Sequence, residues 1–185
     1  LIHNGFPNTN IKSIIANGAN IMAGTDVGVF VSTNNGSSWT SANSGLPNSL
    51  FYSFATNGTN VFIGTQHGIF LSTDNGNSWT SVNTGLIDSA VYSLAVDGTN
   101  IYAGTNAGVF LSYNNGGLWA SINNGITDSA VTSIAISGTN IFAGTGNDGI
   151  FVTNNNGGTW TSINTGLPFT NIHSLAISGT NIYTV

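Results

Sequence analysis

Few residues in this sequence could carry out acid–base chemistry. The chain has six aspartates, no glutamate and no cysteine among 185 residues. A glycosidase needs two carboxyl groups across a bound sugar, one of them with a raised pKa. Asp88 and Asp128 occur in matching segments, Ile87-Asp88-Ser89 and Thr127-Asp128-Ser129, so they are the pair best placed for that reaction.

The same two aspartates have a simpler structural interpretation, which we favour. Aspartate in a Thr/Ser-rich turn commonly caps the backbone of that turn through its own side chain. Asn48 occupies the equivalent place in the first such segment and cannot act as an acid. We therefore predict no catalytic residue and no enzymatic activity, and retain Asp128 as a candidate ligand-binding residue.

Metal and cofactor sites have little support in the sequence. His3, His67 and His173 share no spacing that would assemble a metal site. The lack of cysteine removes thiolate ligands and disulfides as well. We predict no metal and no cofactor.

The charge balance excludes two classes of partner. Lys12 is the single basic residue apart from histidine, the formal net charge is -5, and charged residues make up 4% of the chain. Nucleic acid and anionic membrane surfaces both need several cations on the protein, so neither is an expected partner. A surface of Asn, Ser, Thr and Gly without cysteine is compatible with a bacterial protein that is secreted or held at the cell surface.

An internal repeat organises these residues. Four tryptophans recur at spacings of 40, 40 and 41 residues, at Trp39, Trp79, Trp119 and Trp160. A repeat of about 40 residues with several short strands is typical of a propeller blade. In the third copy the pattern of β-branched and apolar runs between Gly and Asn turns predicts four strands. These strands cover residues 91–96, 101–105, 109–112 and 119–123.

The predicted fold is all-β, a β-propeller of four-stranded antiparallel blades, with four complete blades and a partial blade at the ends. Residues 1–185 form one propeller domain or a segment of one. A β-sandwich and a parallel β-helix are the alternatives, but a fixed four-strand unit with one constant aromatic favours radially packed blades. The repeats cover about 8–47, 48–87, 88–127 and 128–168, with a partial repeat at 169–185.

One motif lies between the third and fourth strand of every unit. Its first copy reads Ser32-Thr33-Asn34-Asn35-Gly36-Ser37-Ser38-Trp39. The Asx side chain can accept backbone N–H bonds in the turn, Gly can take a positive φ, and the indole can pack back over the hairpin. The motif positions are Ser32, Asn34, Gly36, Trp39, Ser72, Asp74, Gly76, Trp79, Ser112, Asn114, Gly116, Trp119, Thr153, Asn155, Gly157 and Trp160.

This motif resembles the Asp-box, S/T-x-D/N-x-G-x-x-W, of the bacterial-neuraminidase-repeat propellers. The family includes sialidases, xyloglucan-cleaving glycosidases, photosystem assembly factors and bacterial surface proteins, so the resemblance implies the fold more than the function. Sialidase activity would need the arginine cluster of that family, and this chain has no arginine. One carboxylate, Asp74, among four boxes is too little for calcium, and the boxes are expected to be structural.

The resemblance also implies two ends for each blade, one with the boxes and the other with the loops between second and third strands. Asp26, Asp88, Asp128 and Asp148 fall at the loop end. The first strand of each blade lines the central channel, and its second residue varies along the chain: Lys12, Tyr52, Tyr92, Thr132 and His173. Tyr52, Tyr92 and His173 suit a sugar ligand by stacking and hydrogen bonding, and packing within the channel is the alternative.

The sequence thus predicts a non-enzymatic structural or interaction module of an exported bacterial protein. A carbohydrate-binding, lectin-like propeller is the alternative, and a glycoside hydrolase comes third. The segment Leu1 to Pro7 aligns with Ser41 to Pro47, the tail of a fourth strand, and Asn181 to Val185 aligns with a second strand. We expect the ring to be completed by another copy of the chain or by the rest of a longer propeller, with glycans as a further partner.

Overall fold

The computed structural model describes residues 4–128 and 130–185, and within them the chain forms strands and turns without a helix. His3 and Ser129, both named above, lie outside the described residues. In chain order the strands are β1 (Ile11–Asn17), β2 (Asn20–Thr25), β3 (Gly28–Ser32), β4 (Thr40–Ser41), β5 (Phe51–Asn57), β6 (Asn60–Thr65), β7 (Gly68–Ser72), β8 (Thr80–Ser81), β9 (Val91–Asp97), β10 (Asn100–Thr105), β11 (Gly108–Ser112), β12 (Ala120–Ser121), β13 (Val131–Ser137), β14 (Asn140–Thr145), β15 (Ile150–Thr153), β16 (Thr161–Ser162), β17 (Leu175–Ser178) and β18 (Asn181–Thr184).

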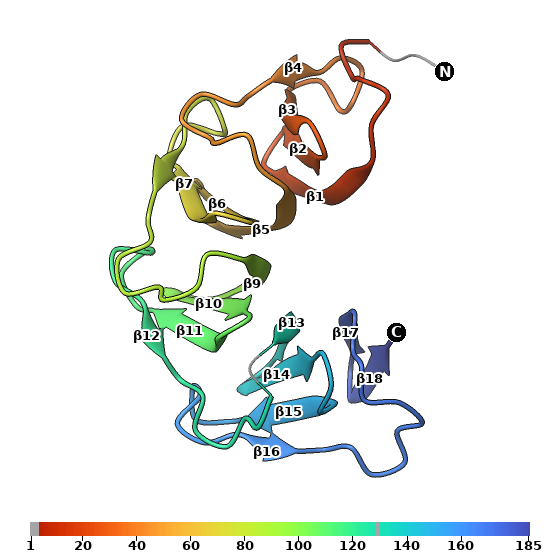
Figure 1. Ribbon diagram of the computed structural model, residues 1–185. Coiled ribbons are helices and arrows are strands. Elements are labelled where there is room, and N and C mark those ends of the chain that lie inside the picture. Colours follow the sequence, from red (N-terminus) through yellow and green to blue (C-terminus); the bar gives the residue numbers. More distant parts are fainter. Residues whose placement is uncertain (1–3, 129) are drawn as a thin grey trace.

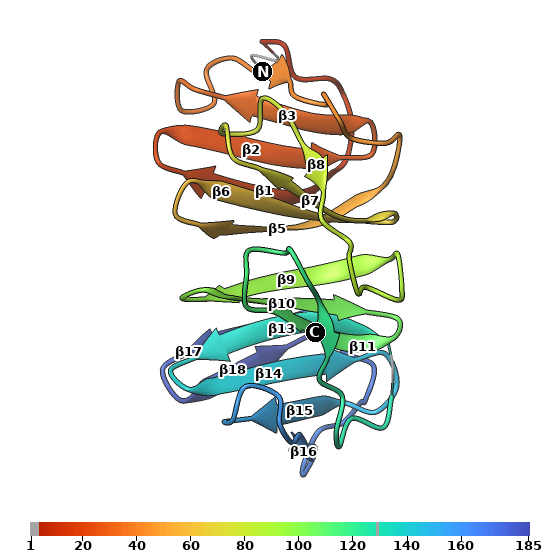
Figure 2. The ribbon, with the colours of Figure 1, turned by 90° about the vertical axis from the view of Figure 1, so that its left-hand side faces the viewer.

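These strands make four four-stranded antiparallel sheets and one pair, β17–β18. Each sheet follows chain order, so it is a simple meander, as a blade requires. The predicted propeller blades are confirmed. Figure 1 shows them as an open arc, with β1, β5, β9, β13 and β17 along its inner side, and Figure 2 shows the blades stacked one after another.

The hydrophobic core lies between neighbouring blades. One cluster joins Met22 and Val31 of the first blade to Phe54 and Ile63 of the second, and the pattern repeats along the chain. The two middle strands of a blade are therefore buried along almost their whole length, because both faces of each blade are covered. Each blade depends on its neighbours for burial.

The fourth strands are shorter than the sequence predicts. Residues 119–123 were expected to form a strand, and only Ala120–Ser121 does so, paired with Leu111 and Phe110. The ladder stops because the Asn123 side chain, through Oδ1, accepts the Val109 N–H at 2.7 Å, in place of a backbone carbonyl. At the other end, the Trp119 N–H donates to the carbonyl oxygen of Thr84 in the preceding blade.

Between the third and fourth strands lie the box turns, defined as residues 32–39, 72–79, 112–119 and 153–160. In each, the first hydroxyl donates to the Asx Oδ1 at 2.6 to 3.0 Å, and the glycine N–H donates to that hydroxyl at 2.8 to 3.2 Å. The residue before the glycine is asparagine in every turn, with φ between 56° and 59°. Asparagine tolerates this left-handed conformation better than most residues.

The tryptophans of the last three box turns share a core cluster with their own blade and also reach the preceding blade, a contact that the sequence did not predict. The indole N–H groups of Trp79, Trp119 and Trp160 donate to the carbonyl oxygens of Ala42, Val82 and Ile122, at 2.9, 2.7 and 2.6 Å. Those three side chains are buried. These three box turns therefore fasten their blades to the preceding ones.

Candidate functional site

The first strand of each complete blade begins with a β-bulge. The pairing runs from Ile11↔Thr25 to Ser13↔Gly24, so Lys12 is an extra residue without a partner on β2. The same register shift leaves one residue of the first strand unpaired in each of the next three blades. A bulge turns a side chain out of the regular alternation and commonly lies beside binding sites. The four bulge residues, here called the bulge row, are Lys12, Tyr52, Tyr92 and Thr132.

The bulge row lies at the loop end of the blades, the end with the loops β2–β3, β6–β7, β10–β11 and β14–β15. Consecutive hairpin turns of an antiparallel meander alternate between two ends, so the box turns lie at the opposite end. The first strands of neighbouring blades contact one another in the order β1, β5, β9, β13. The bulge residues are thus neighbours although they are about 40 positions apart in the sequence.

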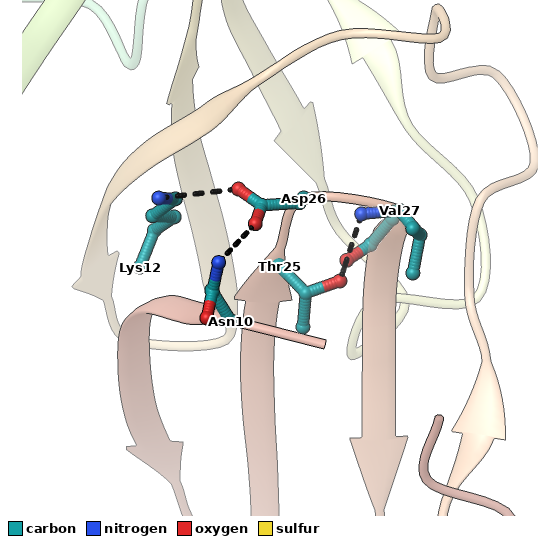
Figure 3. Close-up of polar contacts among 6 residues, drawn as sticks. Asn10, Lys12, Thr25, Asp26 and Val27 are labelled. Carbon is teal, nitrogen blue, oxygen red and sulfur yellow. Dashed lines mark hydrogen bonds and ion pairs between the residues drawn. The ribbon is translucent and has the colours of Figure 1, made fainter. Parts of the chain in front are cut away.

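Lys12 forms the ion pair of the site. Its Nζ lies 3.2 Å from Asp26 Oδ1, and the Asn10 side chain donates to Asp26 Oδ2 at 2.8 Å (Figure 3). The hydrogen bond from Asn10, and then the contact with Lys12, lower the pKa of Asp26. The Asp26 loop is held by Thr25, whose hydroxyl donates to the Gly28 carbonyl and accepts the Val27 N–H.

Tyr52 and Tyr92 stand next to each other in the row. Their ring centroids are 5.3 Å apart and the planes are inclined by 51°, and the Tyr92 hydroxyl donates to Asn106 Oδ1 at 3.1 Å. Both tyrosines are only partly buried. Burial and the neighbouring Tyr92 raise the pKa of Tyr52, whereas nearby Lys12 lowers it. The two rings and the ion pair therefore lie on the first strands of three successive blades.

The remaining candidates are placed differently. Thr132 donates to the carbonyl oxygens of Gly144 and Ile172, so its hydroxyl is committed to the fold. His173 is exposed and precedes β17, and β13 lies between the tyrosines on β5 and β9 and that strand. The structure therefore brings Tyr52 and Tyr92 together and leaves His173 apart from them.

Asp128 serves the turn that carries it. Its Oδ1 accepts the Ala130 N–H at 3.2 Å, and its Oδ2 accepts the Asn147 N–H at 2.8 Å. Asn147 belongs to the longer β14–β15 loop, which contains the extra residue behind the spacing of 41. Asp88 likewise accepts the Ala90 N–H, but its Oδ2 is buried with no partner in the described part of the chain.

Sequence reasoning missed part of this site. Asn10, Asp26 and Asn106 were not candidate ligand residues, although Asp26 and Asn106 contact the bulge row and Asn10 donates to Asp26. The sequence held a usable signal for Asp26. Lys12 is the one strongly basic side chain, and an ion pair with a carboxylate at the same end of its blade could have been expected. Over residues 4–128 and 130–185, no three His, Cys, Asp or Glu side chains gather as a metal site would need, and no helix could cross a membrane.

Solved structures with the same fold come from several kinds of protein. The extracellular domain of BT4673 from B. thetaiotaomicron, described as a one component system, superimposes with a TM-score of 0.78 at 19% identity, over 96% of this chain and 27% of that one. An ancestral GH74 enzyme gives 0.75 at 22% identity, over 94% and 28%. YCF48 from Cyanidioschyzon merolae gives 0.69 at 14%, over 95% and 63%. At these identities the likeness extends to the fold alone.

The chain spans about a quarter of the length of the first two structures. No curated protein matches it in sequence. A family model does match, the DUF6242 beta propeller domain, over residues 51–184, which is most of the chain. With four meander sheets packed blade on blade, this chain belongs to the DUF6242 β-propeller domain family.

Proposed function

We propose that the chain is a non-enzymatic interaction module of an exported bacterial protein, built as an Asp-box propeller whose loop end is the binding surface. The observation that carries this proposal is the bulge row. Four successive blades repeat the same core and box turn. The bulge residue at the loop end, in contrast, is not constant, since it is lysine, tyrosine or threonine at Lys12, Tyr52 and Thr132.

Two further observations support it. In the second box, the Ser72 and Asp74 side chains hold the turn itself and the Trp79 indole holds it to the preceding blade, which fits the structural role expected of an Asp-box. One solved structure of the same fold is described as an extracellular domain, which agrees with an exported protein.

The carboxylates favour binding over catalysis. Asp128 already accepts two backbone N–H groups, so its carboxylate is engaged in holding its own turn and the β14–β15 loop. A polysaccharide panel tests this directly, with release of reducing ends as the readout. Turnover that disappears in Asp128→Asn would make the chain a glycosidase and reject the proposal.

Carbohydrate binding is the second candidate, and the Tyr52–Tyr92 pair is the observation that favours it. Two partly exposed rings 5.3 Å apart offer an apolar face, and the Asn106 amide lies beside the Tyr92 hydroxyl. Sugars combine apolar faces with hydroxyl groups, so such a surface can stack on one and hydrogen-bond to the other. The site is open, so binding is expected to be weak.

A glycan array of neutral and acidic polysaccharides separates these readings. Binding that is lost in the Tyr52→Ala/Tyr92→Ala double variant, and kept in Tyr113→Ala, supports the carbohydrate function. Tyr113 is the matched control, since it is a box-end tyrosine with 62% of its surface exposed. For any ligand found, hydrogen exchange protection confined to the box turns would contradict the proposed loop-end surface.

A further inference from the structure

The chain contains an unusual number of Asn-Gly pairs, which are the sequences most prone to spontaneous deamidation. Eight occur, beginning at Asn4, Asn17, Asn35, Asn57, Asn75, Asn115, Asn124 and Asn156. In this reaction the glycine nitrogen loses its proton and attacks the asparagine Cγ, and ammonia leaves. Water then opens the resulting succinimide at either carbonyl, which gives aspartate or isoaspartate.

The four pairs in the box turns have a glycine nitrogen that is already engaged. The N–H groups of Gly36, Gly76 and Gly116 donate to the serine hydroxyl of their box at 2.8 to 2.9 Å, and that of Gly157 donates to Thr153 at 3.2 Å. Attack on Cγ requires that hydrogen bond to break and the peptide to rotate. The box hydroxyl therefore opposes the first step of deamidation.

Packing adds a second restraint at three of the boxes. A Cβ placed on Gly76 would meet Val31 and Met22 of the preceding blade, and Gly116 and Gly157 lie against the same region of their own preceding blades. Gly36 keeps the hydroxyl bond, but its nearest neighbour is its own Trp39 at 3.9 Å. Asn35 is thus the least restrained of the four box asparagines.

Gly5 and Gly125, which complete the pairs at Asn4 and Asn124, are also confined. Each lies against the backbone carbonyl of a tryptophan in the following box turn, Trp39 and Trp160. Their peptides are fixed as well, since the carbonyl oxygens of Asn4 and Asn124 accept the N–H groups of those tryptophans at 2.9 and 2.8 Å.

The two remaining pairs are in the hairpin turns β1–β2 and β5–β6. Gly18 and Gly58 have nothing within 4 Å of the Cβ position, and within the described residues neither N–H is held by a hydroxyl or carbonyl group. The Asn57 side chain makes one long hydrogen bond, to Asn115 Oδ1 at 3.2 Å. The third hairpin has Asp97 at the same place, so the turn accommodates the aspartate product.

We infer that Asn17 and Asn57 are the sites of spontaneous deamidation in the folded protein, and that the box hydroxyls protect Asn35, Asn75, Asn115 and Asn156. Accessibility alone gives the opposite order, because the box asparagines are exposed and the hairpin asparagines are partly buried. The inference concerns the fold and does not depend on the proposed function.

The test is incubation of the folded protein at mildly alkaline pH, followed by chymotryptic peptide mapping with mass spectrometry and an isoaspartate methyltransferase assay. Asn17 and Asn57 should convert about tenfold faster than the box asparagines, the ratio expected when one hydrogen bond must first be broken. In concentrated urea the eight sites should react at similar rates, since every one precedes glycine.

Ser72→Ala and Ser72→Thr form the matched pair of variants. Loss of the hydroxyl should speed deamidation of Asn75 about tenfold, and threonine should preserve protection, since Thr153 does this work in the fourth box. Asn115 in the same sample reports whether the fold survives. Equal rates at Asn17 and Asn75 in the folded wild type, or an unchanged Asn75 rate in a folded Ser72→Ala variant, would overturn the inference.

Discussion

At the scale of single residues, the box turns show the same geometry built with either of two side chains. Asp74 in the second box accepts hydrogen bonds from the Ser72 hydroxyl and the Ser78 N–H, and Asn34 accepts the equivalent pair in the first box. The difference lies at the second oxygen of Asp74, which accepts the Ser78 hydroxyl at 2.6 Å, whereas the Asn34 amide donates to Ser38. The turn therefore needs one acceptor oxygen on the Asx side chain. It tolerates either a second carboxylate oxygen or an amide NH₂ as the other group.

Asp74 should give the protein a pH-dependent stability that the other boxes lack. The Ser78 hydroxyl, then the Ser78 N–H and the Ser72 hydroxyl, lower the pKa of Asp74 from 3.8 to about 2. A carboxyl whose pKa is lower in the folded state stabilises the fold above its unfolded pKa, and this contribution is lost as pH falls. Melting temperatures measured from pH 3.8 down to about 2 should fall more steeply for the wild type than for Asp74→Asn. Parallel curves would contradict this assignment.

The indole of each box should matter far more than its acidic or amide side chain. Trp119→Ala removes a buried side chain and an inter-blade hydrogen bond, so it should lower the free energy of unfolding by about 3 to 5 kcal/mol. Asp74→Asn should cost little at neutral pH, because three boxes already use Asn. Urea denaturation gives both values. A larger loss for the aspartate variant than for the tryptophan variant would reject the structural role of the box.

At the scale of elements, serines join the first strands of neighbouring blades. Ser93 Oγ on β9 accepts the N–H of Ile134 on β13 at 2.9 Å, and Ser133 Oγ accepts the N–H of Leu175 on β17 at 3.0 Å. Ser53 on β5 has the equivalent position, but its hydroxyl is buried without a partner in the described residues. Ser53 can therefore serve as the control for Ser133, because it occupies the same position without the hydrogen bond.

Ser133→Ala should destabilise the protein and Ser53→Ala should not. The first change leaves a buried backbone N–H without a hydrogen-bond acceptor, and this lowers the free energy of unfolding by about 1 to 3 kcal/mol. The second removes a hydroxyl that has no partner to lose. Denaturation midpoints of the two variants decide the matter, and equal losses would mean that the serine contacts do not stabilise the blade junction.

The sequence predicted the elements well where local pattern decides them. Apolar runs between Gly and Asn turns located the first three strands of the third blade to within about a residue, because turn chemistry and β-propensity act over short distances. The fourth strand was too long, since Asn123 ends its ladder through a side chain. The bulge row was recognised as a variable position, but not as a bulge, because the alternation of residue types along one strand does not show where its register with the next strand shifts.

At the scale of the whole molecule, the arc has an unpaired side at β18. Its outer edge pairs with no strand in residues 4–128 and 130–185, and an apolar hollow of 540 Å³ lies beside it, lined in part by Phe169, Ile182 and Tyr183. Tyr183 is 55% exposed. Sheet edges of this kind readily pair with another strand.

The isolated 185-residue chain should therefore self-associate in solution. Light scattering should give a mass above 19.0 kDa that rises with concentration. Tyr183→Lys places a charge at the exposed edge and should shift the population toward monomer, whereas a lysine at exposed Val27 in the β2–β3 loop should not. A stable monomer at all concentrations would show that the edge is closed in another way.

The indole hydrogen bonds of the box turns run in one direction along the chain, from a blade to the blade before it. The indole N–H groups of Trp79, Trp119 and Trp160 reach back to carbonyl oxygens of the preceding blade, so these tryptophans find their hydrogen-bond partners in chain that has already been synthesised. A ribosome delivers the chain in the same order. Each newly emerged repeat can thus lock onto a finished surface, in the manner of a polymer that grows by addition at one end. Synthesis and assembly would then proceed in step, with no more than one incomplete unit waiting at a time.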